Sequence, residues 1–300
     1  MKKLLLIMNP YSGQKVGKRH LADVLEMFCR EGYAPLTFMT TGPGNATELA
    51  RTYGGQVDLV VCMGGDGTFN EVVSGMLEGK VDTPIGYIPC GSTNDFANSL
   101  KLQKNLRKAA QDILEGVPVT LDVGQFGQRY FSYVASFGAF TRASYATPQN
   151  VKNALGHLAY ILEGIKDIAN IRPYRLRIET EKEVFEGEYL FGAISNATSV
   201  GGILTLNPAA VDMNDGLLEL LLIKPPKNPI ELNDCIRSLQ EQTYDSPMLT
   251  FSSAAQMRIY ADPGMDWTLD GEHERGREDV TVRNVHNAIH LLLRPREGKT

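Results

Sequence analysis

The stretch CMGGDGTFNEVVSG, residues 62–75, joins an apolar segment to a helical pattern through a turn that holds three glycines and one aspartate. Glycine permits positive φ and leaves no Cβ in the way, so the backbone of this turn can approach a large anionic group closely. The amides at the start of the following helix would point at the same group. Asp66 would repel a phosphate unless a cation lay between them, and Mg²⁺ suits that place. The motif therefore predicts a phosphate site with magnesium, although a plain turn rich in small residues is equally compatible with this motif alone.

Strand-like and helix-like patterns alternate on both sides of this turn. The alternation predicts a parallel sheet with helices on both faces. Ligands of such sheets bind beyond the carboxyl ends of the strands. Strands are expected at 3–10, 35–41, 58–65 and 84–92, helices at 18–32, 45–54 and 68–79, and strand-end loops at 9–13, 40–42, 64–68 and 90–95.

From about Leu121 the pattern changes to shorter apolar segments rich in β-forming residues, which predicts a second, strand-rich domain. The last two of these segments are separate and lie at 279–285 and 289–295. Two helices are expected within it, at 156–171 and 228–242. The predicted division is an α/β domain over 1–122 and a β-rich domain over 123–287.

Composition narrows the class of protein. The chain has 300 residues, of which 43% are hydrophobic, so it can bury a sizeable core, and we expect a folded, soluble protein. The apolar run at 4–8 is too short for a signal sequence or a membrane span. Four widely spaced cysteines suggest neither a disulfide framework nor a zinc site and fit a reducing cytoplasm. A net charge of −5 without a long basic run gives no support for nucleic-acid binding.

Five motifs in order carry a resemblance to a known family. They are NPYSG (9–13), GGDGTFNEVVSG (64–75), IPCGSTNDFA (88–97), SVGGILTLNPAAVDMNDGLLEL (199–220) and LDGE (269–272). Together they resemble the bacterial diacylglycerol kinases, which are soluble lipid kinases related to the sphingosine and ceramide kinases. The resemblance runs from Lys3 to about Pro295.

The resemblance implies an ATP-dependent kinase that phosphorylates a lipid hydroxyl, most directly that of diacylglycerol to give phosphatidic acid. It implies a Rossmann-like nucleotide domain, similar to those of phosphofructokinase and NAD kinase, and a β-sandwich-like lipid domain with the active site between the two. It also implies that the final segment, 288–300, returns to the first domain.

Carried over by position, the family's nucleotide contacts fall on the strand-end loops, and the family implies that Asp66 holds a catalytic Mg²⁺, through water. A helix N-cap is the other role open to Asp66. The implied nucleotide residues are Asn9, Pro10, Tyr11, Ser12, Gly13, Thr40, Gly64, Gly65, Asp66, Gly67, Thr68, Phe69, Asn70, Glu71, Ser92, Thr93 and Asn94.

Glu272 matches the family's general base, a carboxylate that would accept the proton of the lipid hydroxyl. Asp270-Gly271 is also a strong hairpin signal, and this motif alone favours the turn. Asp122 aligns with a further acid that joins the water network around the metal. Asp212, Asp215 and the carbonyl of Leu217 resemble a second, structural Mg²⁺ site, because a hard cation prefers oxygen ligands. An acidic loop without a metal is the alternative.

Two other functions remain to be separated. NAD kinases and phosphofructokinases also use a Gly-Gly-Asp-Gly loop, but their Asn-Glu pair stands apart from it, whereas Asn70 and Glu71 follow at once here. A non-catalytic nucleotide- or lipid-binding protein would be expected to lack Asp66 or Glu272. The expected partners are ATP and a membrane lipid, met by reversible contact at the inner face of the membrane, and the family suggests a homodimer. Nothing in the composition distinguishes diacylglycerol from other lipid acceptors.

Overall fold

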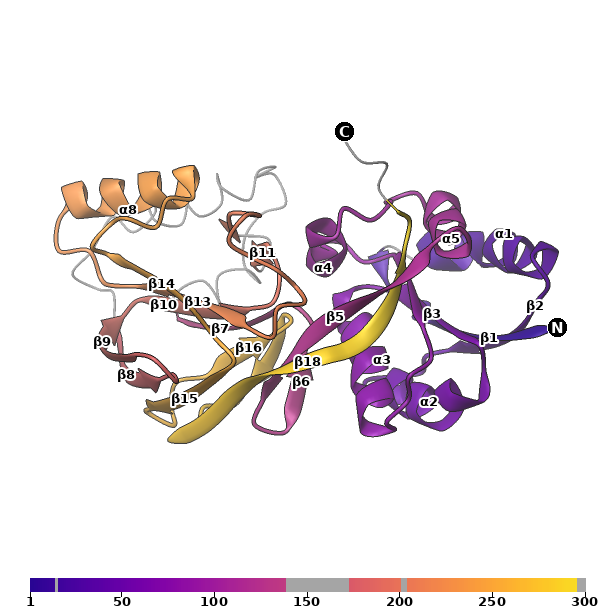
Figure 1. The fold of residues 1–300 in the computed structure, drawn as a ribbon, viewed down its shortest axis with the longest axis horizontal. Helices are drawn as coiled ribbons and strands as arrows, with labels where there is room; N and C mark the ends of the chain where they lie inside the picture. Colours follow the sequence, from indigo (N-terminus) through magenta and orange to yellow (C-terminus); the bar gives the residue numbers. More distant parts are fainter. Residues whose placement is uncertain (14–15, 139–172, 201–203, 296–300) are drawn as a thin grey trace. The chain divides into compact units, whose positions relative to one another are not determined.

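The structure, a computed structural model, describes residues 1–13, 16–138, 173–200 and 204–295 (Figure 1). The helix expected at 156–171 lies outside these residues. Two compact units divide the chain: Met1–Val123 with the C-terminal stretch from His286, and Gly124–Val285. Two strands, β5 (Val117–Phe126) and β18 (Asp279–Leu293), run from one unit into the other.

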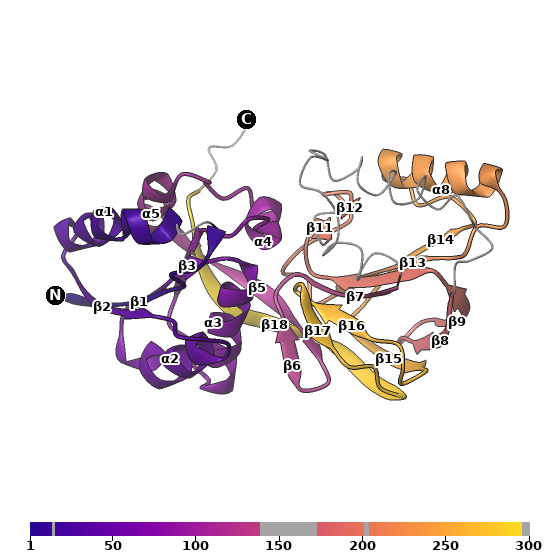
Figure 2. The same cartoon turned by 180° about the vertical axis from the view of Figure 1, so that it is seen from behind.

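The first unit is built on a parallel sheet in the order β2, β1, β3, β4. Figures 1 and 2 show α1 and α5 on one face of this sheet and α2 and α3 on the other. The layered α/β fold predicted from the alternating pattern is confirmed. The strands are β1 (Lys2–Met8), β2 (Tyr33–Met39), β3 (Leu59–Gly64) and β4 (Ile85–Pro89), and the helices are α1 (Val16–Arg30), α2 (Asn45–Tyr53), η2 (Gly54–Gln56), α3 (Asp66–Glu78), α4 (Asp95–Ser99) and α5 (Leu106–Leu114).

Helix α3 begins two residues earlier than the sequence pattern indicated. Gly65 is its N-cap residue and Asp66 its first helical residue. An acidic side chain in the first turn faces the positive end of the helix dipole, so the glycines and the aspartate that looked like a turn can start the helix. Asp66 is therefore part of a regular helix.

The second unit consists mainly of antiparallel strands. One sheet has the order β14, β13, β10, β7, β16, β17, and β8, β9 and β15 join β18 in the other. The core between the sheets contains Phe137, Ile178, Leu220 and Trp267. Helix α8 (Pro229–Glu241) covers the face of the β14–β17 sheet that points away from this core (Figures 1 and 2). The remaining strands are β6 (Arg129–Phe131), β7 (Val134–Gly138), β8 (Tyr174–Glu179), β9 (Val184–Tyr189), β10 (Phe191–Ser195), β11 (Ser199–Val200), β12 (Leu204–Thr205), β13 (Leu218–Ile223), β14 (Leu249–Ala254), β15 (Gln256–Ala261), β16 (Trp267–Leu269) and β17 (Glu272–Glu274).

This arrangement confirms the expected β-sandwich-like domain. Strand β18 replaces the two separate segments expected at 279–285 and 289–295. Its first half pairs with β15, and Leu291 in its second half pairs in parallel with Ile85 of β4. Asn287, with a φ of 54°, provides a local change of backbone direction without ending the strand. Among the described residues, no helix combines the length and the apolar character that crossing a bilayer requires.

Candidate active site

The carboxyl ends of the four parallel strands lie at matching levels of the sheet. Met8 of β1 pairs with both Met39 of β2 and Met63 of β3, and Gly64 pairs with Pro89 of β4. The loops that follow these strands therefore open at one edge, where an open α/β sheet binds ligands. Residues from all four predicted loops meet this edge.

Close backbone contacts hold three of these loops together. Gly13 has a φ of 48°, and a Cβ at this position would lie 1.8 Å from the carbonyl oxygen of Cys90. A Cβ on Gly91 would lie 2.7 Å from the Cα of Gly65. Larger residues would force the loops apart, so the glycines allow the three loops to pack closely while their backbone stays partly exposed.

Asn9 links the first loop to the start of α3. Its side-chain nitrogen donates to the hydroxyl oxygen of Thr68 at 3.0 Å, and its side-chain oxygen accepts from the amide of Tyr11 at 2.9 Å. Tyr11 itself is 74% exposed, which leaves its ring available to a ligand. Thr40 is buried, and its amide donates to the carbonyl oxygen of Met8 at 2.8 Å.

Asp66 lies against the first turn of α4. Its carboxylate accepts from the amide of Asp95 at 2.9 Å and from that of Phe96 at 3.3 Å. Burial, and next the charge of Asp95, raise the pKa of Asp66 to about 6 in spite of these hydrogen bonds. A divalent cation beside these two neighbouring acids would offset their negative charge. Asp95 was not among the predicted site residues, although the motif IPCGSTNDFA contains it.

Three predicted loop residues have side chains that the fold already uses. Phe69 is fully buried and stacks on Tyr87 and Phe96, and Asn70 is buried as well. The carboxylate of Glu71 accepts from the amides of Gly44 and Ala46 at 2.8 and 3.0 Å, at the start of α2. The hydrogen bonds of Glu71 join α3 to α2. Because the ring of Phe69 is buried against Tyr87 and Phe96, any contact of Phe69 with a nucleotide would have to use its backbone.

The loop after β4 presents small polar groups. Ser92 and Thr93 are exposed, and Asn94 closes the loop because its side-chain oxygen accepts from the amide of Gly91 while its side-chain nitrogen donates to the carbonyl of Gly91, both at 2.8 Å. Asn94 has a φ of 53°, a conformation that asparagine adopts more readily than most residues. The two hydroxyl groups therefore face solvent on a closed loop.

Asp122 is buried on β5 and engaged by β18. One oxygen of its carboxylate accepts from Nδ1 of His286 at 2.9 Å and from the amide of Asn287 at 2.8 Å. His290 instead lies 3.1 Å from Thr120 and 3.1 Å from Asp82, so the two histidines serve different partners. Asp122 thus ties the bend of β18 to β5.

In the second unit, Glu272 is the first residue of β17, directly after a tight hairpin turn. Asp270 and Gly271 both have positive φ, 49° and 85°, as a two-residue hairpin requires. The buried carboxylate of Asp270 accepts from the amides of Ser132, Tyr133 and Val134. The turn predicted from Asp-Gly is present, and it holds Glu272 half exposed at a fixed place.

The proposed second metal site lies in the loop before β13. Asp212 accepts from the amide of Asn214 at 3.0 Å, Asp215 accepts from the amide of Leu217 at 2.9 Å, and the carbonyl of Leu217 accepts from Asn284 at 2.8 Å. In the ranges that the structure covers, no three His, Cys, Asp or Glu side chains gather as a metal site would require. The predicted site has only two carboxylates, with one main-chain carbonyl as its third ligand, and it remains a prediction.

A buried glutamate lies beside this loop, and no sequence motif indicated it. Glu219 is 1% exposed on β13, and one of its carboxylate oxygens has no hydrogen-bond partner among the described residues. Burial, and then the charges of Asp215 and Asp212, raise its pKa to about 8. Hidden in the apolar run LLELLLI, this residue looked like part of an ordinary strand.

We expect Glu219→Gln to stabilise the fold at alkaline pH and to have little effect near pH 4. A carboxyl whose pKa rises on folding favours the folded state below its unfolded pKa, 4.5, and loses that contribution as the pH rises through about 8. At pH 9 the variant should gain on the order of a few kcal/mol in unfolding free energy. Urea unfolding between pH 4 and 9 in EDTA measures this, with exposed Glu188→Gln on β9 as the control. Parallel curves for wild type and Glu219→Gln would contradict it.

Known proteins are similar to this chain over almost its whole length. The family model "Diacylglycerol kinase catalytic domain" matches residues 3–126, and "YegS C-terminal NAD kinase beta sandwich-like domain" matches residues 134–293. A diacylglycerol kinase of Bacillus subtilis is 33% identical over 299 residues, covering 99% of this chain and 98% of that protein. One of Staphylococcus saprophyticus is 33% identical over 275 residues, covering 91% and 89%. A crystal structure of a diacylglycerol kinase from Bacillus anthracis superposes with a TM-score of 0.75 at 18% identity, covers 98% of this chain and 97% of that one, and shows the shared fold.

The chain combines a glycine-rich loop at the strand ends of a parallel sheet with a β-sandwich-like unit, and the family match shows that it is a kinase that transfers phosphate to the hydroxyl group of a lipid. The chain belongs to the diacylglycerol kinase family, and as a kinase of this family it uses ATP. The resemblance that the five motifs suggested is thereby confirmed.

Proposed function

We propose that this protein transfers the γ-phosphoryl group of ATP to the free hydroxyl of diacylglycerol and so forms phosphatidic acid. The observation that carries the proposal is the placement of Asp66 at the carboxyl edge of the sheet, in contact with the first turn of α4. The names of the curated relatives support diacylglycerol as the acceptor.

The residues at this edge fit a nucleotide. The partly exposed backbone at Gly13, Gly65 and Gly91, which carries no side chains, suits a triphosphate. The exposed hydroxyl groups of Ser92 and Thr93 can add hydrogen bonds. The exposed ring of Tyr11 is available to the rest of the nucleotide. These groups bind and orient the substrate, which is most of what phosphoryl transfer requires of a protein.

The donor set also fits Mg²⁺. Asp66 would hold the ion, through water, with Asp95 beside it and Asp122 as a further acid of the same unit. When bound, the ion neutralises charge on the β- and γ-phosphate oxygens. Asp212, Asp215 and the Leu217 carbonyl would hold a second ion with a structural role.

Glu272 is the proposed general base. Its carboxylate would accept the proton of the lipid hydroxyl while the hydroxyl oxygen bonds to the γ-phosphorus and the bond from that phosphorus to the departing ADP oxygen breaks. A half-exposed side chain on a well-anchored hairpin suits this role, because it is accessible and held in place.

The proposed location follows from the two substrates. ATP is cytoplasmic and diacylglycerol lies in a membrane, so we place the protein in the cytoplasm with transient contact at the inner membrane face. The exposed Lys101, Lys104 and Lys108 are suited to an anionic surface, where each basic residue contributes on the order of 1 kcal/mol. A homodimer, frequent in the family, is part of the same proposal.

The deciding experiment is phosphate transfer from labelled ATP to a panel of acceptors in mixed micelles: diacylglycerol, phosphatidylglycerol, ceramide and, as a water-soluble alternative, NAD. The expected result is labelled phosphatidic acid. Transfer to another lipid would overturn the acceptor and keep the reaction, and transfer to NAD alone would overturn both. ATP binding without any transfer would identify a regulatory binding protein.

A further inference from the structure

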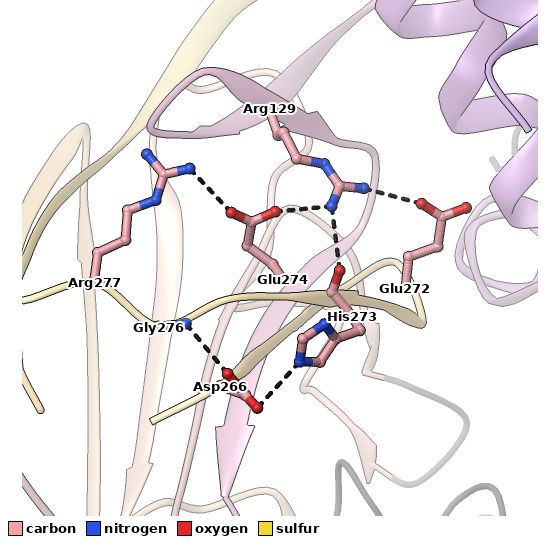
Figure 3. A network of polar contacts seen from close by, with 7 residues as sticks. All are labelled: Arg129, Asp266, Glu272, His273, Glu274, Gly276 and Arg277. Atoms are coloured by element: carbon pink, nitrogen blue, oxygen red, sulfur yellow. Dashed lines mark hydrogen bonds and ion pairs between the residues drawn. The ribbon is translucent and has the colours of Figure 1, made fainter. Parts of the chain in front are cut away.

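A network of charged residues surrounds Glu272 in the second unit (Figure 3). Arg129, the first residue of β6, places Nη2 2.9 Å from Oε2 of Glu272 and Nη1 2.8 Å from Oε2 of Glu274. Side chains two residues apart on a strand share a face, so β17 presents both carboxylates to the same guanidinium. One arginine thus joins the proposed base to a second acid.

The second acid is a firm anchor for the arginine. Glu274 is only 10% exposed, and its other oxygen lies 3.0 Å from Nη2 of Arg277. Arg129 also donates from Nη1 to the carbonyl of His273 at 3.3 Å. An isolated surface ion pair contributes little, because two long side chains must be ordered for one contact. Here several contacts order Arg129, so its further contact with Glu272 costs less conformational freedom.

The backbone that carries the two partners is joined as well. Asp270, at the tip of the hairpin before Glu272, accepts from the amides of three residues that directly follow β6. The strand that bears Arg129 and the turn that bears Glu272 are therefore connected independently of the ion pair. Loss of the Arg129 side chain should leave this connection in place.

We propose that Arg129 is a positioning residue for the phosphoryl transfer and acts through Glu272, an inference that rests on the proposed role of Glu272. The guanidinium holds Oε2 of the carboxylate, and Figure 3 shows the other oxygen directed away from the arginine. That oxygen has no hydrogen-bond partner among the described residues. Arg129 thereby fixes the rotamer that offers the free oxygen to the lipid hydroxyl, and Glu274 and Arg277 fix Arg129.

The first test is steady-state kinetics of Arg129→Gln with diacylglycerol and ATP. A misplaced catalytic group slows the chemical step, so we expect kcat to fall about 10- to 100-fold while both KM values stay within about twofold. Arg129→Lys keeps the charge but loses the fork that joins two carboxylates, and should recover part of kcat. Arg258→Gln is the matched control, since Arg258 is an arginine of the same unit paired with Asp279 at 2.6 Å, and its kcat should match wild type. A raised KM with unchanged kcat would overturn the proposal, because Arg129 would then bind a substrate directly.

The second test is a double-mutant cycle. In a Glu272→Gln background, Arg129→Gln should reduce kcat by less than about twofold, because a residue that acts only through Glu272 has nothing left to position. Losses of kcat that multiply in the double variant would overturn the proposal.

A second variant covers the case in which circular dichroism shows that Arg129→Gln does not fold. Glu274→Gln frees Arg129 from its anchor, and it enters the same cycle with the same expectation. A Glu272→Gln enzyme with wild-type kcat would show that Glu272 is not the general base. A wild-type protein without activity on any lipid would contradict the proposed function. These two outcomes differ from multiplicative losses, so each failure can be told from the others.

Discussion

Asp66→Asn is expected to lower the rate of phosphate transfer to diacylglycerol by on the order of 10³-fold or more. Asparagine has the same size but keeps only one oxygen acceptor, so it can accept from the amide of Asp95 or of Phe96 but not from both. Loss of one such hydrogen bond costs on the order of 1 kcal/mol, so the turn should survive. What the substitution removes is the negative charge at the edge of the sheet where the phosphates are expected. Metal-assisted stabilisation of developing charge is worth several kcal/mol, which sets the size of the loss.

Initial rates over a titration of Mg²⁺ measure this effect, and no concentration of the ion should restore the wild-type rate. Asp58→Asn is the control, because Asp58 lies just before the opposite end of the same strand, β3, where it accepts from the amide of Lys3. That variant should keep full activity. A rate for Asp66→Asn within tenfold of wild type, in a variant that melts like wild type, would contradict the role of Asp66.

Glu272→Gln should reduce kcat by about 10²- to 10⁴-fold, the usual contribution of a positioned general base. Glutamine preserves the shape and can still accept from Arg129, but it cannot take the proton of the lipid hydroxyl. Since Asp66 and the glycine-rich loops lie in the other unit, the affinity for ATP should change little.

Quench-flow or steady-state transfer to diacylglycerol measures kcat, and calorimetry measures ATP binding. The nearby exposed Glu278→Gln provides the matched control and should behave as wild type. Loss of ATP affinity in Glu272→Gln, with kcat retained, would assign this side chain to nucleotide binding and remove it from the chemistry.

Much of the fold follows from local patterns. The apolar runs that became β1 and β3, and the amphipathic spacing that became α1 and α8, were predictable because neighbouring residues alone define these periods. The division of β18 into two segments was wrong, because pairing with β15 and β4 extends the strand through residues that have little strand character of their own. Helix α5 was not predicted at all, although Asn105 caps it by accepting from the amide of Lys108.

In the candidate site too, some residues could be predicted from the sequence and others could not. The motifs around Asp66 and Glu272 were recognisable because glycines and acids stand at fixed short spacings. The roles of their partners were not: Asp95 beside Asp66, Arg129 beside Glu272 and the α2 contacts of Glu71 all join residues at least 25 positions apart. Such contacts depend on how strands and helices pack, which no short window of sequence contains.

The sequence by itself determined the alternating α/β unit, the β-rich unit, the glycine-rich loop and the class of reaction, since each of these rests on local backbone preferences or on ordered motifs. Only the tertiary structure decided that Glu219 is buried beside an acidic loop and that one arginine holds two glutamates of β17. Electrostatic environment is set by distance and burial in three dimensions, and for these residues both arise from segments brought together only by folding.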